Sequence, residues 1–299
     1  MMRQQREWAR IVGGSTKKVF PQTEASETTS GFTRAFWERE RRKRSHESRQ
    51  TLKQHTFDMK GVKNGDAGGG SLKISVDAIV MDYDRTVADE ALGFKISDDA
   101  KRKLRNLRKL RRCKLILATG RRLYDIPDKE AVEIFHAVIT ENGTICNTEK
   151  GRVRRILVED GWFDKKERLN RLFLKGGLNF HSGEVILAGY REDLERFKRM
   201  IHDARMDQEV LIEFNKEGLM VLPAGWNKGR GTKIALEALG GGRLLAIGDD
   251  FNDLSLFEAA DIKVAVKNAV PELKAKADIV CDKEGGEGVI EIITSLMGG

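Results

Sequence analysis

Three short apolar segments, each followed by a cluster of polar residues, constrain the fold of this chain more than any other feature. They are ISVDAIVM at 74–81, KLILA at 114–118 and RLLAI at 243–247, and the clusters DYD, TGR and GDD follow them. Each segment is rich in β-branched and aliphatic residues and has the length of a strand that is buried on both faces. The chain is therefore expected to contain a sheet with one polar edge.

Between these segments, apolar residues recur every three or four positions, which is the spacing of an amphipathic helix. The clearest case is 98–112, where Ala100, Leu104, Leu107 and Leu110 share one face. Further strands are predicted at 137–140, 262–266 and 278–281, and further helices at 232–239, 253–260 and 288–296. Strands that alternate with helices predict a Rossmann-like doubly wound α/β core, with helices on both faces of a parallel sheet. Ligands bind such sheets beyond the carboxyl ends of the strands, where the polar clusters lie.

The middle of the chain continues the alternation with shorter and more variable elements. Strands are predicted at 153–158, 184–188, 209–214 and 217–222, and helices at 164–175 and 191–205. This length suits a small α/β cap domain that is inserted into the core and covers its polar edge. We therefore divide the chain into an N-terminal arm at 1–71, a core at 72–146 and 224–299, and a cap at 147–223.

The positive charge of the chain is concentrated in the arm. Of 54 Lys+Arg and 46 Asp+Glu, residues 1–70 hold 15 and 8, which is +7 of the total of +8. The arm has few apolar residues at any regular period, so we expect it to be disordered. Its basic cluster at 39–44 leaves a function of another class open, in which the arm binds nucleic acid. In a further alternative, the biological chain starts at Met59.

The remaining composition favours a cytoplasmic protein. No run approaches about 18 uninterrupted apolar residues, so no membrane-spanning helix is expected. The arm lacks the apolar segment of a secretory signal peptide and has too many acidic residues for a typical transit peptide. Cys113, Cys146 and Cys281 are odd in number and widely spaced, which indicates reduced thiols rather than a disulfide framework or a zinc site.

The strand ends carry three carboxylates whose chemistry can be considered together. Asp82, Asp84 and Asp249 would repel one another if they came together without a cation, and oxygen ligands of this kind suit Mg²⁺. A carboxylate beside Mg²⁺ can attack phosphorus, and a second one can protonate the leaving oxygen and then activate water. Since residues i and i+2 of a strand face the same side, Asp82 and Asp84 can face one phosphate, while Tyr83 points into the core.

The transferring phosphoryl group also needs hydrogen-bond donors and a cation. Thr119, the backbone amide of Gly120 and Lys228 fit those needs. Each of these elements alone is a weak signal, because similar pairs and turns occur by chance. Their shared position after apolar strands is what predicts a phosphatase site.

These motifs resemble those of the haloacid dehalogenase-like phosphatase superfamily, over residues 74–297. IVMDYDRT at 79–86 resembles its first motif, LATGR at 117–121 its second, NKG at 227–229 its third and GDDFND at 248–253 its fourth. The stretches ENG at 141–143 and VAVKNAVPEL at 264–273 are similar to the Cof-like, type IIB branch. In that branch an α/β cap is inserted between the second and third motifs.

The resemblance implies a role for each motif residue. Asp82 would be the nucleophile and a Mg²⁺ ligand, and Asp84 the general acid/base, with its backbone carbonyl on the metal. Asp249 and Asp253 would complete the metal site. Thr119 and Lys228 would bind the phosphoryl oxygens, with Asn252 on the phosphate side.

The substrate is less constrained than the reaction. The branch includes archaeal phosphoglycolate phosphatases, so 2-phosphoglycolate is the expected substrate, with a sugar-phosphate phosphatase or a phosphomutase as alternatives. His181, Tyr190 and Trp226 could face the substrate, although packing is the favoured role for each. Arg85 stands where the first motif usually has glycine and could add a cation near the entrance or face solvent. No sequence feature specifies an oligomeric state.

Overall fold

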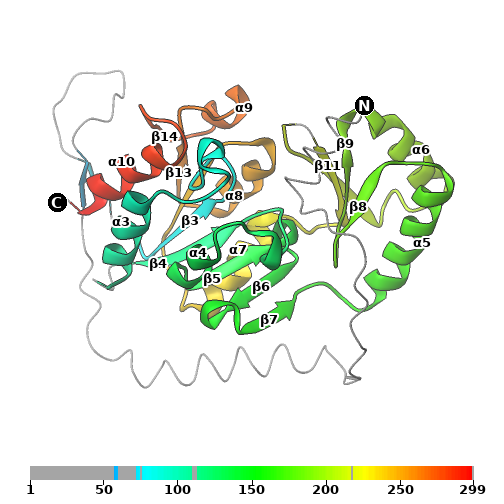
Figure 1. Ribbon diagram of the computed structural model, residues 1–299, viewed down its shortest axis with the longest axis horizontal. Helices are drawn as coiled ribbons and strands as arrows, with labels where there is room; N and C mark the ends of the chain where they lie inside the picture. Colours follow the sequence, from blue (N-terminus) through cyan, green and yellow to red (C-terminus); the bar gives the residue numbers. More distant parts are fainter. Residues whose placement is uncertain (1–56, 60–71, 75, 110–112, 217, 298–299) are drawn as a thin grey trace.

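The computed structural model describes residues 57–59, 72–74, 76–109, 113–216 and 218–297. Its largest element is an eight-stranded sheet with the order β14-β13-β12-β3-β4-β5-β6-β7 (Figure 1). The strands are β3 (Ala78–Asp82), β4 (Lys114–Ala118), β5 (Ala137–Thr140), β6 (Ile145–Thr148), β7 (Val153–Ile156), β12 (Leu244–Gly248), β13 (Ile262–Ala265) and β14 (Ile279–Val280). All residues of β3, β5 and β12 are buried, as expected for strands with near-continuous apolar sequences.

The sheet is mixed rather than fully parallel. Strands β14 to β5 pair in parallel, whereas β5 with β6 and β6 with β7 are antiparallel. The strand predicted at 153–158 is thus the edge strand β7 of the large sheet and not a part of the smaller sheet. Tight turns join these strands, and such short connections give antiparallel pairs. We propose that the inserted domain begins after β7, later than residue 147.

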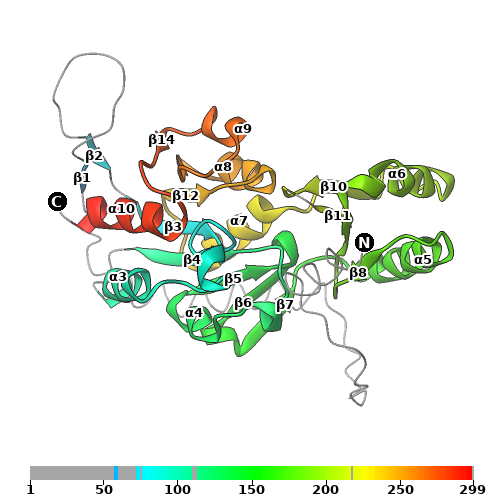
Figure 2. The ribbon, with the colours of Figure 1, turned by 45° about the horizontal axis from the view of Figure 1, so that its top comes forward.

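Helices flank the large sheet in two groups (Figure 2). One group comprises α3 (Asp98–Lys109), α4 (Lys129–Ile134) and α10 (Gly285–Met297), and the other comprises α7 (Lys228–Ala238) and α8 (Leu254–Ala259). The short helix α9 (Pro271–Lys274) lies between β13 and β14. These layers confirm the predicted doubly wound α/β architecture. Helix α7 begins at Lys228, four residues earlier than the sequence predicted. This earlier start brings Lys228 into the first turn of the helix.

The smaller domain lies beside the core in both views (Figures 1 and 2). Its sheet has the order β10-β11-β9-β8, and all its pairs are antiparallel. The elements are α5 (Gly161–Lys175), β8 (Phe180–Ser182), β9 (Leu187–Tyr190), α6 (Leu194–Asp203), β10 (Val210–Phe214) and β11 (Gly218–Pro223). Its buried apolar side chains form a cluster separate from that of the core. The two clusters indicate that each domain has its own hydrophobic core.

The start of the chain is described only in part. The strand β1 (Phe57–Met59), which falls in the predicted arm, pairs antiparallel with β2 (Leu72–Ile74). The predicted strand at 74–81 is therefore divided between the end of β2 and β3. The rest of the predicted disordered arm, including its basic cluster and the proposed nucleic-acid contact, lies outside the described residues. Among those described, no helix has the length and apolar character needed to cross a membrane.

Candidate active site

The register of the central strands brings the polar clusters together. Asp82, the last residue of β3, pairs with Ala118 of β4, and Met81 pairs with Ile247 of β12. The residues that follow β4 and β12 therefore flank Asp82 on both sides. Parallel strands end at the same edge of a sheet, so one edge collects the motifs from three distant parts of the chain.

Lys228 links two of the aspartates at the centre of the site. Its Nζ lies 2.5 Å from Asp82 Oδ1 and 2.7 Å from Asp253 Oδ1, and only 2% of its side chain is exposed. Burial lowers the pKa of Lys228, but attraction to Asp253 and Asp82 outweighs that effect, so its pKa is raised. Lys228 is therefore a fixed cation beside the predicted nucleophile.

Asp249 is contacted by cationic groups from the core and from the smaller domain, which corresponds to the predicted cap. Lys216 Nζ, from the turn between β10 and β11, lies 2.8 Å from Asp249 Oδ2, and Arg85 Nε lies 3.8 Å away. The hydroxyl of Thr86 donates to Asp249 Oδ1 at 3.1 Å. The pKa of Asp249 is raised to about 6, mainly by burial. Repulsion from Asp253 adds to the rise, and attraction to Lys216 opposes it.

Asp82, Asp249 and Asp253 form a candidate cation site. Each can offer one carboxylate oxygen to a common point, those oxygens lie within 4.8 Å of one another, and all three residues are buried. Burial raises the pKa of Asp82 well above its usual value, and repulsion from Asp253 adds to the rise. A hard divalent cation would relieve this repulsion, and an all-oxygen donor set suits Mg²⁺. The residues present therefore fit the predicted metal.

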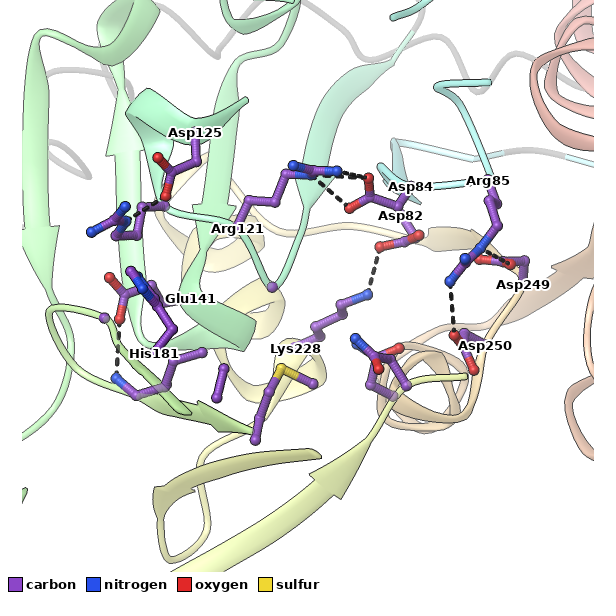
Figure 3. Close-up of a pocket in the computed structure, with 18 residues that line it drawn as sticks. Asp82, Asp84, Arg85, Arg121, Asp125, Glu141, His181, Lys228, Asp249 and Asp250 are labelled. Carbon is purple, nitrogen blue, oxygen red and sulfur yellow. Dashed lines mark hydrogen bonds and ion pairs between the residues drawn. The ribbon is translucent and has the colours of Figure 1, made fainter. Parts of the chain in front are cut away.

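Arg121 holds the predicted acid/base residue in place. Its Nε lies 2.9 and 3.0 Å from the two oxygens of Asp84, and a terminal nitrogen lies 2.7 Å from Oδ1. The guanidinium is 6% exposed, whereas Asp84 is 26% exposed. A bidentate pair of this kind fixes the direction of the carboxylate. Asp84 and Asp82 both line the pocket (Figure 3).

The pocket between the two domains encloses about 90 Å³. Core residues form its charged side, and Ile186, Ala188 and Met220 of the cap form an apolar wall. Figure 3 shows His181 and Glu141 at one side and Asp249 and Asp250 at the other. This division suits a molecule with a phosphoryl group at one end and a small organic group at the other.

A chain of hydrogen bonds joins the cap to the fourth motif. Asn252 Nδ2 donates to Asn142 Oδ1 at 3.2 Å, and Asn142 Nδ2 donates to Glu213 of β10. Asn252 lines the pocket, and its Oδ1 is buried with no hydrogen-bond partner among the described residues. Burial raises the pKa of Glu213 to about 7, against the hydrogen bond from Asn142.

Comparisons with known proteins agree with this geometry. A family model described as a haloacid dehalogenase-like hydrolase matches residues 175–293. "Phosphoglycolate phosphatase 2" of Saccharolobus solfataricus is 34% identical over 226 residues, which covers 74% of this chain and 92% of the relative. "Phosphoglycolate phosphatase" of Sulfurisphaera tokodaii is 32% identical over 225 residues, covering 73% of this chain and 93% of the relative.

The chain belongs to the haloacid dehalogenase-like hydrolase family. It is a phosphatase, as are these two relatives, which align with it over more than nine-tenths of their length. Two solved structures that share its fold illustrate the likeness. A haloacid dehalogenase-like hydrolase from Bacillus subtilis has a TM-score of 0.61 and 17% identity, and the match covers 73% of this chain and 99% of that one. A sugar phosphatase of subclass IIB has a TM-score of 0.60 and 17% identity, and the match covers 74% of this chain and 98% of that one.

The family motifs place most of the predicted residues in the pocket, with two exceptions. Thr119 is fully buried and does not line it; its hydroxyl accepts a hydrogen bond from the backbone N–H of Arg121 at 3.1 Å. Asp253 is also behind the pocket wall, where its Oδ2 accepts hydrogen bonds from the N–H groups of Asp249 and Asp250. Gly120 lines the pocket beside Asp82 and Lys228.

Arg85, which replaces the usual glycine of the first family motif, adopts a left-handed backbone with φ of 60°. This conformation explains why glycine is favoured there. The side chain lines the pocket, and its terminal nitrogen lies 3.6 Å from Asp250 Oδ2. Arg85 thus adds a cation at the pocket, one of the two roles considered from the sequence.

The other aromatic and cysteine residues mostly have packing roles. Tyr83 is buried and donates from its hydroxyl to the carbonyl of Phe94 at 2.6 Å. Trp226 is 6% exposed and packs under Arg230. His181 lines the pocket, whereas Tyr190 is not among the lining residues. The three cysteines are buried free thiols, as predicted.

Sequence reasoning missed several residues that the structure brings to the site. Arg121 and Glu141 line the pocket, and Lys216 contacts Asp249 beside it. Arg121 lies inside the TGR motif, and its position directly after the phosphate-binding turn could have identified it. Glu141 lies in the ENG stretch, which the sequence marked only as a turn and a family feature. No local pattern marked Lys216, because its contact with Asp249 arises only when the cap docks on the core.

Proposed function

We propose that this phosphatase requires Mg²⁺ and hydrolyses a small phosphorylated metabolite, with 2-phosphoglycolate as the favoured substrate, through an aspartyl-phosphate on Asp82. The observation that carries the proposal is the convergence of Asp82, Asp249 and Asp253 around Lys228 at one buried point. Such a concentration of buried carboxylates is costly without cations, and it is the arrangement that phosphoryl transfer with a metal requires.

In the first step, an oxygen of Asp82 attacks phosphorus and the bond from phosphorus to the leaving oxygen breaks. Asp84 donates a proton to that oxygen, so the alcohol leaves neutral. In the second step, Asp84 takes a proton from a water molecule, which attacks the aspartyl-phosphate and restores the carboxylate of Asp82. Lys228 and the backbone amide of Gly120 face the phosphoryl oxygens in this proposal.

Asp82, Asp249 and Asp253 would hold Mg²⁺, with the backbone carbonyl of Asp84. When bound, Mg²⁺ offsets the negative charge that otherwise keeps a carboxylate and a phosphate ester apart. Arg121 keeps Asp84 directed toward the pocket through its bidentate pair. The apolar cap wall limits the access of bulk water to the reacting groups.

Two observations support a small substrate. The pocket is small for a ligand site, with a volume of about 90 Å³. Two relatives that match most of the chain are named "Phosphoglycolate phosphatase" and "Phosphoglycolate phosphatase 2". Because residues of the cap form the far wall, they are expected to select the organic part of the substrate.

The test is release of phosphate by purified protein from 2-phosphoglycolate and from a panel of sugar phosphates. We expect activity that needs Mg²⁺, is lost with EDTA and is highest for 2-phosphoglycolate. Asp82→Asn should lower kcat by about a thousandfold or more, as loss of a covalent nucleophile does. Asp98→Asn, at an exposed carboxylate on α3, is the matched control.

Each component of the proposal has its own contrary result. Asp82→Asn with wild-type kcat would refute the aspartyl-phosphate. Full activity in EDTA would refute the metal requirement. A preference for a sugar phosphate would replace 2-phosphoglycolate, and isomerisation of that sugar phosphate without phosphate release would identify a phosphomutase.

A further inference from the structure

Glu141 makes contacts that the phosphatase chemistry does not use. It lies in the core, directly after β5, and its side chain points at the cap. Its Oε1 accepts a hydrogen bond from the backbone N–H of Glu184 at 2.8 Å, and its Oε2 accepts from those of Val185 at 2.7 Å and Ile186 at 3.0 Å. One core carboxylate therefore receives three consecutive N–H groups of one cap turn.

The burial of Glu141 makes these contacts strong. The residue is 1% exposed, and a buried carboxylate is stable only where donors or cations satisfy it. Three backbone N–H groups that converge on one anion provide that environment, and hydrogen bonds to an ionised acceptor are stronger than neutral ones. The cap turn and the core carboxylate therefore depend on each other.

The cap turn is also held from its other side. Lys166 Nζ, on α5, donates to the carbonyl of Gly183 at 2.8 Å and to the hydroxyl of Ser182 at 3.0 Å. Glu141 of the core binds the N–H groups of the turn, and Lys166 of the cap helix α5 binds one of its carbonyls. The turn is therefore held from both sides. The turn contributes Gly183 and Ile186 to the pocket wall.

The local backbone shows that this placement is built into the fold. Glu141 and Asn142 have φ of 46° and 54°, a left-handed conformation that costs free energy for residues other than glycine. This conformation directs the side chain of Glu141 to the cap, while the backbone N–H of Glu141 donates to the carbonyl of Arg121 at 2.9 Å. A Cβ on Gly183 would lie 2.7 Å from Glu141 Oε2, so the turn needs glycine at this point of closest approach.

We propose that Glu141 is a positioning residue that holds the cap turn 183–186 against the core and so sets the wall that contacts the organic end of the substrate. The proposal rests on the proposed function, because it assigns that wall to substrate binding. The phosphoryl-binding residues all lie in the core and do not depend on this contact. Loss of the contact should therefore weaken substrate binding more than it slows the chemistry.

The variant Glu141→Gln tests this at nearly constant shape. The amide offers one acceptor oxygen in place of two, so at least one N–H group of the turn loses its partner. We expect faster hydrogen exchange of the amides at 184–186, a KM about tenfold higher and a kcat within about threefold of wild type. Inhibition by vanadate, which mimics the phosphoryl group alone, should stay unchanged.

Two further variants make the test specific. Gly183→Ala should give the same pattern, because the added methyl group displaces the carboxylate from the turn. Glu184→Gln is the matched control: its own side chain pairs with Arg154 near the surface, while its backbone N–H still binds Glu141. It should keep wild-type exchange and KM.

Wild-type exchange at 184–186 in Glu141→Gln would overturn the proposal. A fall in kcat with unchanged KM would also overturn it, because the residue would then act on the chemistry. Equal effects of Glu184→Gln and Glu141→Gln would remove the special role of the buried carboxylate. Failure of the wild-type protein to hydrolyse any phosphate ester would refute the proposed function instead, while the exchange data would still report on the contact.

Discussion

The core edge and the cap contribute to the candidate active site in different ways. In the core, Lys228 is 2% exposed, Asp249 is 1% exposed and Asp253 is fully buried, and each is fixed by more than one partner. On the cap, Lys216 is 28% exposed and extends from a hairpin turn. The core therefore supplies charges at fixed positions, whereas the cap supplies contacts that depend on how the two domains meet.

Lys228→Met should break the core side of this comparison and have the largest effect on stability. The change keeps the length of the side chain but leaves two buried carboxylates without their shared cation, which costs about 3 to 5 kcal/mol. Urea unfolding followed by fluorescence measures the loss. Lys233→Met, at an exposed position of the same helix, is the control and should change stability by less than about 0.5 kcal/mol.

An unchanged unfolding midpoint for Lys228→Met would show that the carboxylates find other partners. Added Mg²⁺ should recover part of the stability, because it supplies positive charge to the same oxygens. If Mg²⁺ has no effect on this variant, the three carboxylates do not form the cation site.

The same contrast explains which parts of the molecule could be predicted from the sequence. The strands at 114–118 and 137–140 were predicted with their observed bounds, because buried parallel strands are continuous apolar runs. The short strand β6, with the mixed sequence ICNT, was missed, and β7 was assigned to the wrong sheet. Both belong to an antiparallel edge whose pairing is set by tight turns and not by hydrophobic pattern.

The candidate site follows the same rule. Residues such as Asp82 and Asp249 could be found because each lies directly after an apolar strand, a local signal. Partners such as Lys216 or Arg121 could not be paired with them, because their contacts join residues 33 and 37 positions apart across the fold. Local patterns thus predict which residues reach the edge. The pairing of core strands brings Arg121 to Asp84, and the docking of the cap brings Lys216 to Asp249.

Glu213→Gln sharpens the comparison at a cap residue that is buried against the core. Burial raises the pKa of Glu213 from 4.5 to about 7. Between these pH values, the folded protein therefore holds a proton on Glu213 that the unfolded chain has lost. The stability contributed by this group is therefore full at low pH and falls as the pH rises from 4.5 to about 7. Glutamine stays neutral, so the variant should match wild type at pH 5 and exceed it at pH 8 by roughly 3 kcal/mol.

Urea unfolding of both proteins at pH 5 and pH 8 measures this difference, and comparison of the two removes the titration of the groups they share. Glu209→Gln serves as the control, because that carboxylate is partly exposed and pairs with Lys165. Equal differences at the two pH values would contradict the raised pKa of Glu213.

Lys216→Met tests the cap side at the metal-binding carboxylates, with the smallest expected effect. Lys216 Nζ lies 2.8 Å from Oδ2 of Asp249, a residue that is proposed to bind Mg²⁺, and the two cations repel each other. Because Lys216 is partly exposed, we expect the variant to bind Mg²⁺ only about fivefold more tightly, which is about 1 kcal/mol. Isothermal titration calorimetry measures this affinity without substrate, and Lys198→Met on α6 is the control for loss of a cap cation. The backbone N–H of Lys216 keeps its 2.9 Å hydrogen bond to Asp250 Oδ2 in the variant, so the hairpin should stay docked. Weaker binding of Mg²⁺ would instead mean that the cap lysine helps to hold Asp249 in the geometry that the metal needs.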